Sequence, residues 1–262
     1  SKYENKKVFY YTNFAFDGYR SVCAYKFIAE KSFWELFPDA ELGIVIASDI
    51  NNKPDECKSR DEIIKCLADA NIKAKKFIDK DTLSECSAVS VWRDAFQKFK
   101  KKKGNRSSIE ALLNRVQKGN EVGPINPLVD IYNTMSLTYG LPCGGEDLDN
   151  IIGTMRLTLS ENGGEEFIAI GDTENDPTLP GELCYLDDKG AVCRCWNWRD
   201  GTRTMLTDDS TSAFLIFESV DPSRHDDLVA AVSELAALVS KHLGGEIKAQ
   251  KILTKDDSEI TL

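Results

Sequence analysis

The chain has 262 residues, of which 42% are hydrophobic, and a formal net charge of −10. This length allows one or two domains with a substantial core, and the ordinary composition is typical of a folded globular protein. The negative charge argues against non-specific nucleic-acid binding by the whole surface, but it leaves room for a local basic patch. No apolar run approaches the length of a membrane span, and no charged-then-apolar leader is found.

The eight cysteines are scattered and contain no Cys-x-x-Cys pair, and the two histidines are His225 and His242. This pattern gives poor support for a zinc site. We therefore expect reduced thiols, no cofactor or metal, and a cytoplasmic protein. The oligomeric state does not follow from the sequence.

Residues 1–88 read as an α/β segment that packs on the main domain. Apolar runs at 8–11 and 42–47 predict strands. The aromatic run 33–38 predicts a turn whose rings join the core. Apolar spacing within 61–70 predicts a helix. We find no catalytic motif in this segment.

A basic stretch follows, in which residues 91–99 predict a helix and residues 100–106 a loop. Ser107 and Glu110 fit a capping box for a second helix that ends at Gly119. A lysine run can be a solvated loop, or it can bind a phosphate backbone. Under the second interpretation, the tRNA-binding residues are Lys98, Lys101, Lys102, Lys103, Arg106 and Arg115.

The stretch 126–139 predicts one helix with clear ends. Asn126 is a good N-cap, Pro127 suits the first helical position, and Gly140 ends the helix. An apolar stripe shares the helix with a polar face that carries Asn126, Asp130 and Asn133. Those polar groups can line a small pocket, or they can merely tie neighbouring loops by hydrogen bonds.

The remainder alternates strands and turns. Cys143-Gly144-Gly145 predicts a bend without bulk beside the polar helix face. The runs 151–159, 167–171, 182–186, 191–196 and 212–220 predict strands, with a turn at 196–201. Asp221 or Ser223 can cap a last helix that packs on the domain, ends at 244–245 and leaves a short tail.

The residues Asn126-Pro-Leu-Val-Asp-Ile-Tyr-Asn133, followed by Gly-Leu-Pro at 140–142, resemble the B3/4 domain in the beta subunit of phenylalanyl-tRNA synthetase. That domain has Asn, Val-Val-Asp, Thr-Asn-Tyr, Gly-Gln-Pro-Leu-His and Phe-Asp at matching spacing. The match continues to 214–218 and 221–222, and the chain is most similar to free-standing relatives of the domain. The resemblance implies an α/β (α+β) fold, with mixed and antiparallel sheets packed with helices. We place the B3/4-like domain at 89–225, after the 1–88 segment and before a C-terminal helix and tail at 226–262.

In the synthetase, this domain hydrolyses tyrosine wrongly attached to the phenylalanine tRNA. By position, the asparagine of that domain falls on Asn133 and its histidine on Gly144, so this chain lacks the histidine. Its glutamate falls on Ile216, and Glu218, two residues on and on the same strand face, is a candidate substitute. We therefore expect the catalytic residues to be Asn133, Asp130 and Glu218, of which Asn133 is the one that the resemblance supplies directly.

Substrate binding is expected from residues on the polar helix face, the glycine bend, the turn that follows the hairpin and the polar entry to the last strand. These residues are Asn126, Gly144, Gly145, Asn197, Arg199 and Thr211. Arg199 can bind a carboxylate or phosphate, or it can pair structurally with Asp130 or Glu182. Trp196 and Trp198 can belong to the core or stack on a base. Cys143 is a weak candidate nucleophile, because no histidine is near it in the chain.

Two functional hypotheses follow, and both need the polar helix and the tryptophan-flanked strand end to face each other across a cleft. In the first, the protein is a trans-acting deacylase that hydrolyses the aminoacylated 3′ end of a mischarged tRNA. In the second, the same pocket holds an amino acid, a nucleotide or an RNA end without chemistry. A structural role in an RNA-handling complex is a third alternative.

Overall fold

The computed structural model describes residues 26–262, so the strand expected at 8–11 lies outside the described residues. The helices are α2 (Lys31–Leu36), α3 (Arg60–Lys73), α4 (Ser87–Ala95), α5 (Ser108–Gln117), α6 (Pro127–Tyr139) and α7 (His225–Leu243). The strands are β1 (Lys26–Ala29), β2 (Glu41–Ser48), β3 (Cys143–Asp147), β4 (Met155–Ser160), β5 (Glu182–Leu186), β6 (Ala191–Arg194), β7 (Arg199–Asp200), β8 (Ala213–Ser219), β9 (Glu246–Leu253) and β10 (Glu259–Thr261). Short 3-10 turns are η1 (Pro54–Glu56), η2 (Ala74–Phe77), η3 (Leu83–Glu85), η4 (Leu148–Asn150) and η5 (Pro222–Arg224).

The strands form two sheets, which confirms the expected α/β (α+β) class with mixed and antiparallel sheets. The six-stranded sheet has the order β10-β1-β4-β5-β6-β7, and the four-stranded sheet has the order β3-β8-β2-β9. Only the pairing of β1 with β4 is parallel among the strand pairs of residues 26–262.

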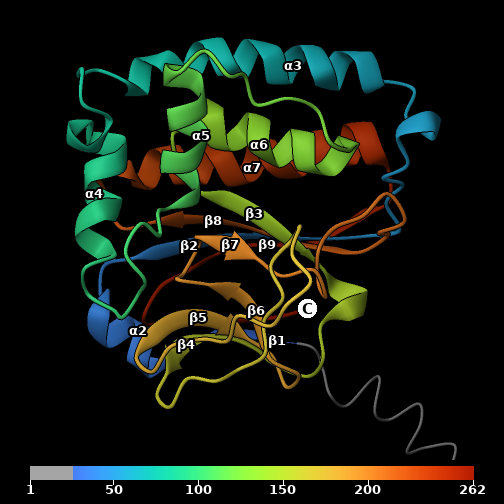
Figure 1. Cartoon of the computed structure of the whole chain (residues 1–262). Coiled ribbons are helices and arrows are strands. Elements are labelled where there is room, and N and C mark those ends of the chain that lie inside the picture. Colours follow the sequence, from blue (N-terminus) through green and yellow to red (C-terminus); the bar gives the residue numbers. More distant parts are fainter. Residues whose placement is uncertain (1–25) are drawn as a thin grey trace, which may run out of the picture.

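The molecule has three layers, with helices over the four-stranded sheet and the six-stranded sheet beneath it (Figure 1). One apolar cluster lies between the helices and the four-stranded sheet, and it includes Leu128, Leu228 and Leu215. The larger cluster lies between the two sheets and includes Phe27 and Trp196. The four-stranded sheet is therefore buried on both faces, so its central strands are apolar on both sides.

Strand β2 shows how this double burial is built. Ile44 and Ile46 belong to the cluster between the sheets, whereas Val45 belongs to the cluster under the helices. At Gly43, an added Cβ would lie 2.4 Å from Cγ2 of Val232 on α7. Glycine fits there because the Val232 and Leu228 side chains of α7 occupy the space of a Cβ.

Several local predictions were wrong. The expected bend at Cys143–Gly145 is the start of strand β3, because its backbone pairs with β8 in register from Cys143↔Phe217 to Asp147↔Ala213. The expected turn at 33–38 is mostly helix α2. The run 167–171 forms only an isolated bridge between Ala169 and Gly201, and Gly171 has a positive φ of 90° that ends any extension. The expected tail after α7 is the strand pair β9 and β10.

Other elements agree with the sequence patterns. Helices are present at α3, α5, α6 and α7, and the hairpin β5–β6 is formed. The three expected segments 1–88, 89–225 and 226–262 contribute strands to one sheet. Strand β2 from the first segment lies between β8 from the second and β9 from the third. Every cysteine from Cys57 onward is a free thiol. No helix within residues 26–262 has the length and apolar content to cross a membrane.

Candidate functional site

Helix α6 begins at a doubly capped N-terminus. The Oδ1 atom of Asn126 accepts a hydrogen bond from the Val129 amide at 3.0 Å. Asn52 donates to the same Oδ1 at 3.1 Å, and its own Oδ1 accepts from the Leu128 amide at 2.8 Å. Two buried side chains thus satisfy amides that a helix start otherwise leaves free. Asn126 therefore fixes the helix that carries Asn133.

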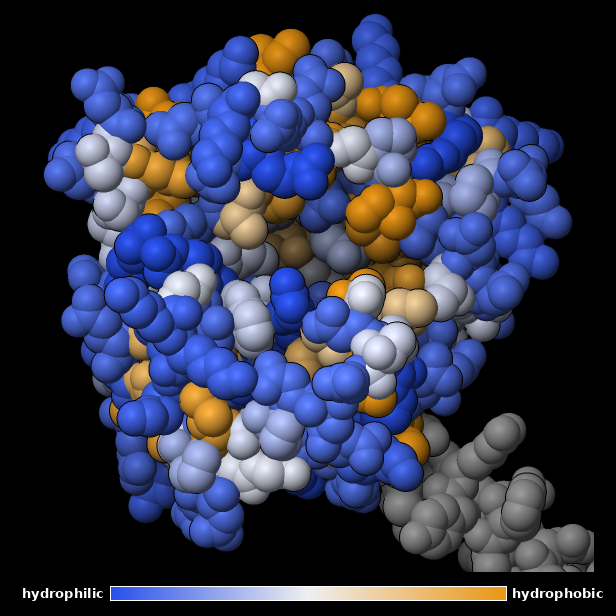
Figure 2. Space-filling view, viewed as in Figure 1, coloured by the Kyte–Doolittle hydropathy of each residue, from blue (hydrophilic) through white to orange (hydrophobic). Residues whose placement is uncertain are grey.

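A cavity of about 220 Å³ lies between α5, α6, β3, β8 and the turn after β6. Figure 2 shows this face hollowed between the helical layer and the lower sheet. The lining residues are Ser108, Ala111, Leu112, Tyr132, Asn133, Cys143, Gly144, Gly145, Glu146, Tyr185, Cys193, Trp196, Asn197, Trp198, Asp200, Phe214, Ile216 and Glu218. The polar helix and the tryptophan-flanked strand end therefore face each other across one cleft, as the sequence predicted.

The turn that closes the cavity is strained and firmly held. Cys195 and Trp196 have positive φ values of 47° and 59°, which L-residues adopt only at a cost. The Trp196 ring is fully buried and packs against Phe33 and Trp92, at centroid distances of 5.0 and 4.8 Å. Trp196 is thus a core residue, whereas the half-buried Trp198 lies in the cavity wall.

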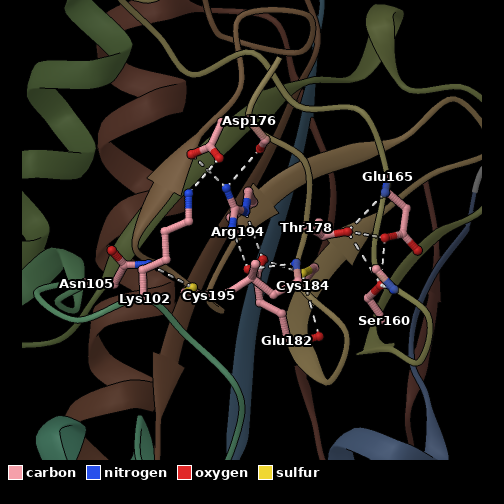
Figure 3. Close-up of polar contacts among 12 residues, drawn as sticks. Lys102, Asn105, Ser160, Glu165, Asp176, Thr178, Glu182, Cys184, Arg194 and Cys195 are labelled. Atoms are coloured by element: carbon pink, nitrogen blue, oxygen red, sulfur yellow. Dashed lines mark hydrogen bonds and ion pairs between the residues drawn. The ribbon is translucent and has the colours of Figure 1, made fainter. Parts of the chain in front are cut away.

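A buried arginine holds the start of this turn. The Arg194 guanidinium is fully buried and donates to Glu182 from Nε at 3.0 Å and from a terminal nitrogen at 2.6 Å. It also pairs with Asp176 at 3.0 Å, and Lys102 reaches the same carboxylate at 2.8 Å. Figure 3 shows Arg194 between the two carboxylates, with Lys102 approaching Asp176 from the basic loop. The network therefore fixes the basic loop next to the turn.

Glu218 enters the cavity from β8, on the same strand face as Ile216 and Phe214. Its carboxyl accepts a short hydrogen bond from the Tyr185 hydroxyl. Burial raises the pKa of Glu218 to about 8, even though this hydrogen bond works in the opposite direction. Such a group changes its charge close to neutral pH, which suits proton transfer.

Glu146 and Asp200 form a second acidic group in the cavity. Burial raises the pKa of Glu146 well above its usual range, and the neighbouring Asp200 raises it further. Burial also raises the pKa of Asp200, while its hydrogen bond to Glu146 partly offsets this effect. Glu146 is buried and Asp200 is half-buried. Two carboxyl groups this close cannot both be ionised cheaply, so the pair retains a proton.

Burial also strongly raises the pKa values of Tyr132, Cys143, Tyr185 and Cys193 in the cavity wall. Burial raises the pKa of the Cys143 thiol well above its usual range, and the charge on Glu218 adds to the effect. Cys143 is therefore a neutral thiol rather than a nucleophilic thiolate. Burial likewise keeps the Tyr185 hydroxyl protonated, so it remains a hydrogen-bond donor.

The structure brings five of the nine expected catalytic and substrate-binding residues to the cavity: Asn133, Gly144, Gly145, Asn197 and Glu218. Asp130 lies elsewhere, fully buried, where it accepts from Arg60 at 2.6 Å and from the Ile125 amide at 2.7 Å. Asn126 caps α6, and Thr211 is exposed near Asp149. These contacts within the protein explain the positions of Asp130, Asn126 and Thr211, and no bound ligand is needed to explain them.

Arg199 also points away from the cavity. It is exposed, pairs with Asp172 at 3.8 Å, and lies over the Trp198 ring at 5.2 Å. Its neighbour Asp200 is the residue that lines the cavity. Successive strand residues face opposite sides of a sheet, so the predicted cavity residue was off by one position in the sequence. Glu146, Tyr185 and Asp200 were missed for the same reason, since their facing depends on strand register.

The basic loop is only partly free. Lys102 pairs with Asp176, Arg106 lies 3.4 Å from Glu110, and Arg115 donates to the Glu121 carbonyl at 2.7 Å. Lys98 donates to the Leu36 carbonyl at 3.3 Å. Within the described chain, neither Lys101 nor Lys103 has an ion-pair partner. These two lysines, with the exposed Lys100, are therefore available to a phosphate.

The family model of the B3/4 domain matches residues 91–244, which is more than half of the chain. The chain belongs to the B3/4 domain family. A phenylalanine–tRNA ligase beta subunit from Cutibacterium acnes is 35% identical over 100 residues, which cover 38% of this chain and 11% of that protein. The chain thus spans a small part of that relative's length.

A solved N-terminal fragment of the phenylalanyl-tRNA synthetase beta subunit from Pyrococcus horikoshii is also similar. The superposition covers 89% of this chain and 52% of the fragment, at 13% identity and a TM-score of 0.44.

Proposed function

We propose that this B3/4 protein hydrolyses the ester bond of a mischarged aminoacyl-tRNA, with the aminoacyl group bound in the 220 Å³ cavity. The observation that carries the proposal is that polar groups from four different elements converge in one cleft: Asn133, Asn197, Glu146 and Glu218. The cavity is smaller than the roughly 300–1,000 Å³ of pockets for drug-sized ligands. It therefore suits an aminoacyl group better than a whole nucleotide.

Ester hydrolysis needs an activated water and donors for the developing oxyanion. With a pKa of about 8, Glu218 is the residue best suited to accept the proton of the water. Asn133 is half-buried in the cavity wall and is available to orient the water or the carbonyl oxygen. Asn197 is held in place because its Oδ1 accepts from the Ser108 amide at 3.2 Å.

The test incubates the protein with a panel of tRNAs that carry wrong amino acids and measures amino-acid release. We expect release to depend on Glu218 and Asn133, so Glu218→Gln and Asn133→Ala should each lower the rate by about 10²-fold or more. Because Glu218 must be ionised to act as a base, the wild-type rate should rise with pH up to about 8 and then level off. Glu161→Gln, a change at an exposed residue outside the cavity, is the matched control.

The alternative is a binding module that holds an aminoacyl or nucleotide group without hydrolysis. One observation favours it: Gly144, which occupies the position of the related domain's histidine, has only open space within 4 Å of an added Cβ. Thermal-shift titrations with amino acids and adenosine analogues separate the two functions. Saturable binding by a folded protein that releases no amino acid from any tRNA of the panel would establish the module and exclude the enzyme.

A further inference from the structure

The cavity that would hold the aminoacyl group is strongly acidic. Glu146, Asp200 and Glu218 all line it, and no Lys, Arg or His of residues 26–262 does. Arg203 acts on Glu146 from outside the wall, and its guanidinium is bound to Asp187 by two hydrogen bonds of 2.7 Å. Nothing within the wall therefore neutralises the carboxyl groups, and a bound cation would.

The same wall contains buried donors that lack a partner. The Asn197 side chain is only 8% exposed, and its Nδ2 atom makes no hydrogen bond to any described residue. The Nε1 atom of the fully buried Trp196 is also unsatisfied. Both nitrogens lie close enough to Glu218 to lower its pKa, but neither makes a hydrogen bond of normal geometry with it. An unpaired buried donor is costly, so Asn197 offers a site for an acceptor atom from a ligand.

Acidic and donor groups occupy different parts of the cavity. Glu146 pairs in register with Phe214 on β8, and Glu218 lies four residues further along that strand. At about 3.3 Å per residue, the two backbone positions are roughly 13 Å apart. Asn197 lies near Glu218, and Asp200 lies near Glu146. The Asp200 side chain is nevertheless close enough to Glu218 to raise its pKa, so the two ends approach each other within the cavity. A ligand between them therefore needs a cationic group and a neutral acceptor.

We propose that the cavity selects α-aminoacyl groups in their esterified or amidated form, with the Glu146–Asp200 pair binding the free α-ammonium and Asn197 Nδ2 donating to the carbonyl oxygen. This inference rests on the proposed function and specifies its substrate class. An N-blocked amino acid lacks the cation that the pair requires. A free amino acid carries a carboxylate, which is repelled by buried carboxyl groups that no cation of the wall offsets.

The selection also explains how product would leave. Hydrolysis converts a neutral ester into a carboxylate, and that new charge lies among Glu146, Asp200 and Glu218. The substrate is therefore bound more tightly than its product, although the two share the same side chain. The discrimination depends on whether the α-carboxyl group of the ligand is esterified or free. It therefore applies to any amino acid whose side chain fits the cavity.

Binding of the ammonium should also release a proton. The pair shares one proton when the cavity is empty, and a bound cation favours the doubly ionised form. The titratable or charged groups that face the pair from the surrounding elements are Tyr132 on α6, Cys143 on β3, Tyr185 on β5, Cys193 on β6, Glu218 on β8 and Arg203 in the following loop. Burial keeps the tyrosines and cysteines neutral, and Glu218 lies at the other end of the cavity. The pair, which would contact the ammonium directly, is therefore the expected source of the proton.

The experiment measures binding of small probes to the full chain by isothermal titration calorimetry. The probes are alaninamide, phenylalaninamide and tyrosinamide, each compared with its free amino acid and with the deaminated amide. We expect at least one amide to bind roughly tenfold or more tightly than both of its analogues. Titration in phosphate and in Tris, which differ in ionisation enthalpy, should show release of up to one proton. Equal binding of an amide and either analogue, or no binding by any amide, would overturn the proposal.

Substitutions locate the subsite. Glu146→Gln and Asp200→Asn should each weaken amide binding about tenfold or more and abolish proton release, and Asn197→Ala should weaken binding while release persists. Asp172→Asn, which removes the partner of Arg199 outside the cavity, is the matched control and should change neither quantity. Circular dichroism and unfolding curves establish that each variant is folded, and proton release that persists in a folded Glu146→Gln variant would refute the assignment.

Failure of this inference and failure of the proposed function can be told apart. The amides report binding without the deacylation reaction, so selective amide binding without tRNA deacylation would remove only the proposed function. Deacylation by a protein that binds free amino acids as well as amides would remove only the inferred selectivity.

Discussion

The two adjacent glycines of β3 lie in opposite surroundings at the cavity edge. An added Cβ at Gly144 would meet nothing within 4 Å, because this position faces open space. At Gly145 the same atom would lie 2.6 Å from the Leu215 side chain and 3.1 Å from the Phe214 carbonyl oxygen. Neither glycine has a positive φ, so backbone strain does not distinguish them.

We predict that Gly145→Ala destabilises the protein by about 1–3 kcal/mol, because the methyl group overpacks the contact with β8. Gly144→Ala should be neutral or stabilising by up to about 1 kcal/mol, because it restricts the unfolded chain and clashes with nothing. Urea unfolding of both variants measures the difference. Equal free energies of unfolding would show that β3 does not lie against β8 as described.

At this scale, the sequence predicts some side-chain positions better than others. The cap at Asn126 and the placement of Glu218 on the same face as Ile216 follow from local spacing. Local spacing does not predict that Asp200, rather than Arg199, lines the cavity. Strand β7 has only two residues, and its pairing with β6 determines which side chain faces the cavity. A one-residue change of phase reverses which side chain enters the cavity.

Helices α3 and α6 are joined by a buried ion pair rather than by apolar contacts alone. Asp130 is fully buried, and its pKa is raised by burial although the Ile125 amide and Arg60 work against the shift. The Arg60 side chain is 17% exposed and lies 2.6 Å from the carboxylate. Asp130 was expected to be catalytic, but these contacts give it a structural role.

We predict that Asp130→Ala lowers the free energy of unfolding by about 3 kcal/mol, since it leaves Arg60 and the Ile125 amide without their partner. The double variant Arg60→Ala/Asp130→Ala should be no less stable than Asp130→Ala alone, because the two changes remove one interaction. Chemical denaturation provides both values. Additive losses from the two single variants would argue against this coupling.

Prediction of the elements succeeded where periodicity is local. Helix α6 has a cap, an apolar stripe and a terminating glycine in one stretch, all readable from the sequence. Strand β3 reads as a loop because Gly144 and Gly145 are poor strand formers, and its conformation comes from pairing with a strand about 70 residues later. Long-range pairing can therefore override local preference.

On the scale of the whole molecule, an acidic chain carries a local group of cations between α4 and α5. The loop between α4 and α5 is fixed beside the cavity turn, because Asn105 donates to Cys195 at 3.3 Å and Lys102 binds Asp176. If the protein binds tRNA, as we propose, the unpaired Lys101 and Lys103 should contact phosphates next to the cavity mouth.

We predict that Lys101→Ala/Lys103→Ala weakens tRNA binding and makes the dependence of log affinity on log salt shallower by roughly 2, one unit for each lost phosphate contact. Amide binding in the cavity should be unchanged. Lys65→Ala/Lys73→Ala, which removes two exposed lysines from α3, is the control of equal charge. Filter-binding titrations over a range of salt measure the slopes, and identical slopes for the two double variants would rule out the loop as the phosphate site.

The protonated cavity also affects the stability of the whole fold. Glu218 has a pKa of about 8 in the folded protein against 4.5 for the free side chain, so the folded state binds the proton more tightly. Between pH 4.5 and 8 the unfolded chain ionises while the folded protein stays protonated, and the free energy of unfolding must therefore fall as the pH rises. The raised pKa values of Glu146 and Asp200 act in the same direction.

We predict a decrease of a few kcal/mol in the free energy of unfolding between pH 5 and 8, measured by urea denaturation at constant ionic strength. Glu218→Gln should flatten this dependence, because glutamine remains neutral and can still accept from the Tyr185 hydroxyl. Relative to wild type, the variant should gain stability as the pH rises, whereas Glu161→Gln should keep the wild-type slope. An unchanged slope in Glu218→Gln would mean that Glu218 is already ionised in the folded protein, and it would remove this residue from the proposed role of a base that titrates near neutral pH.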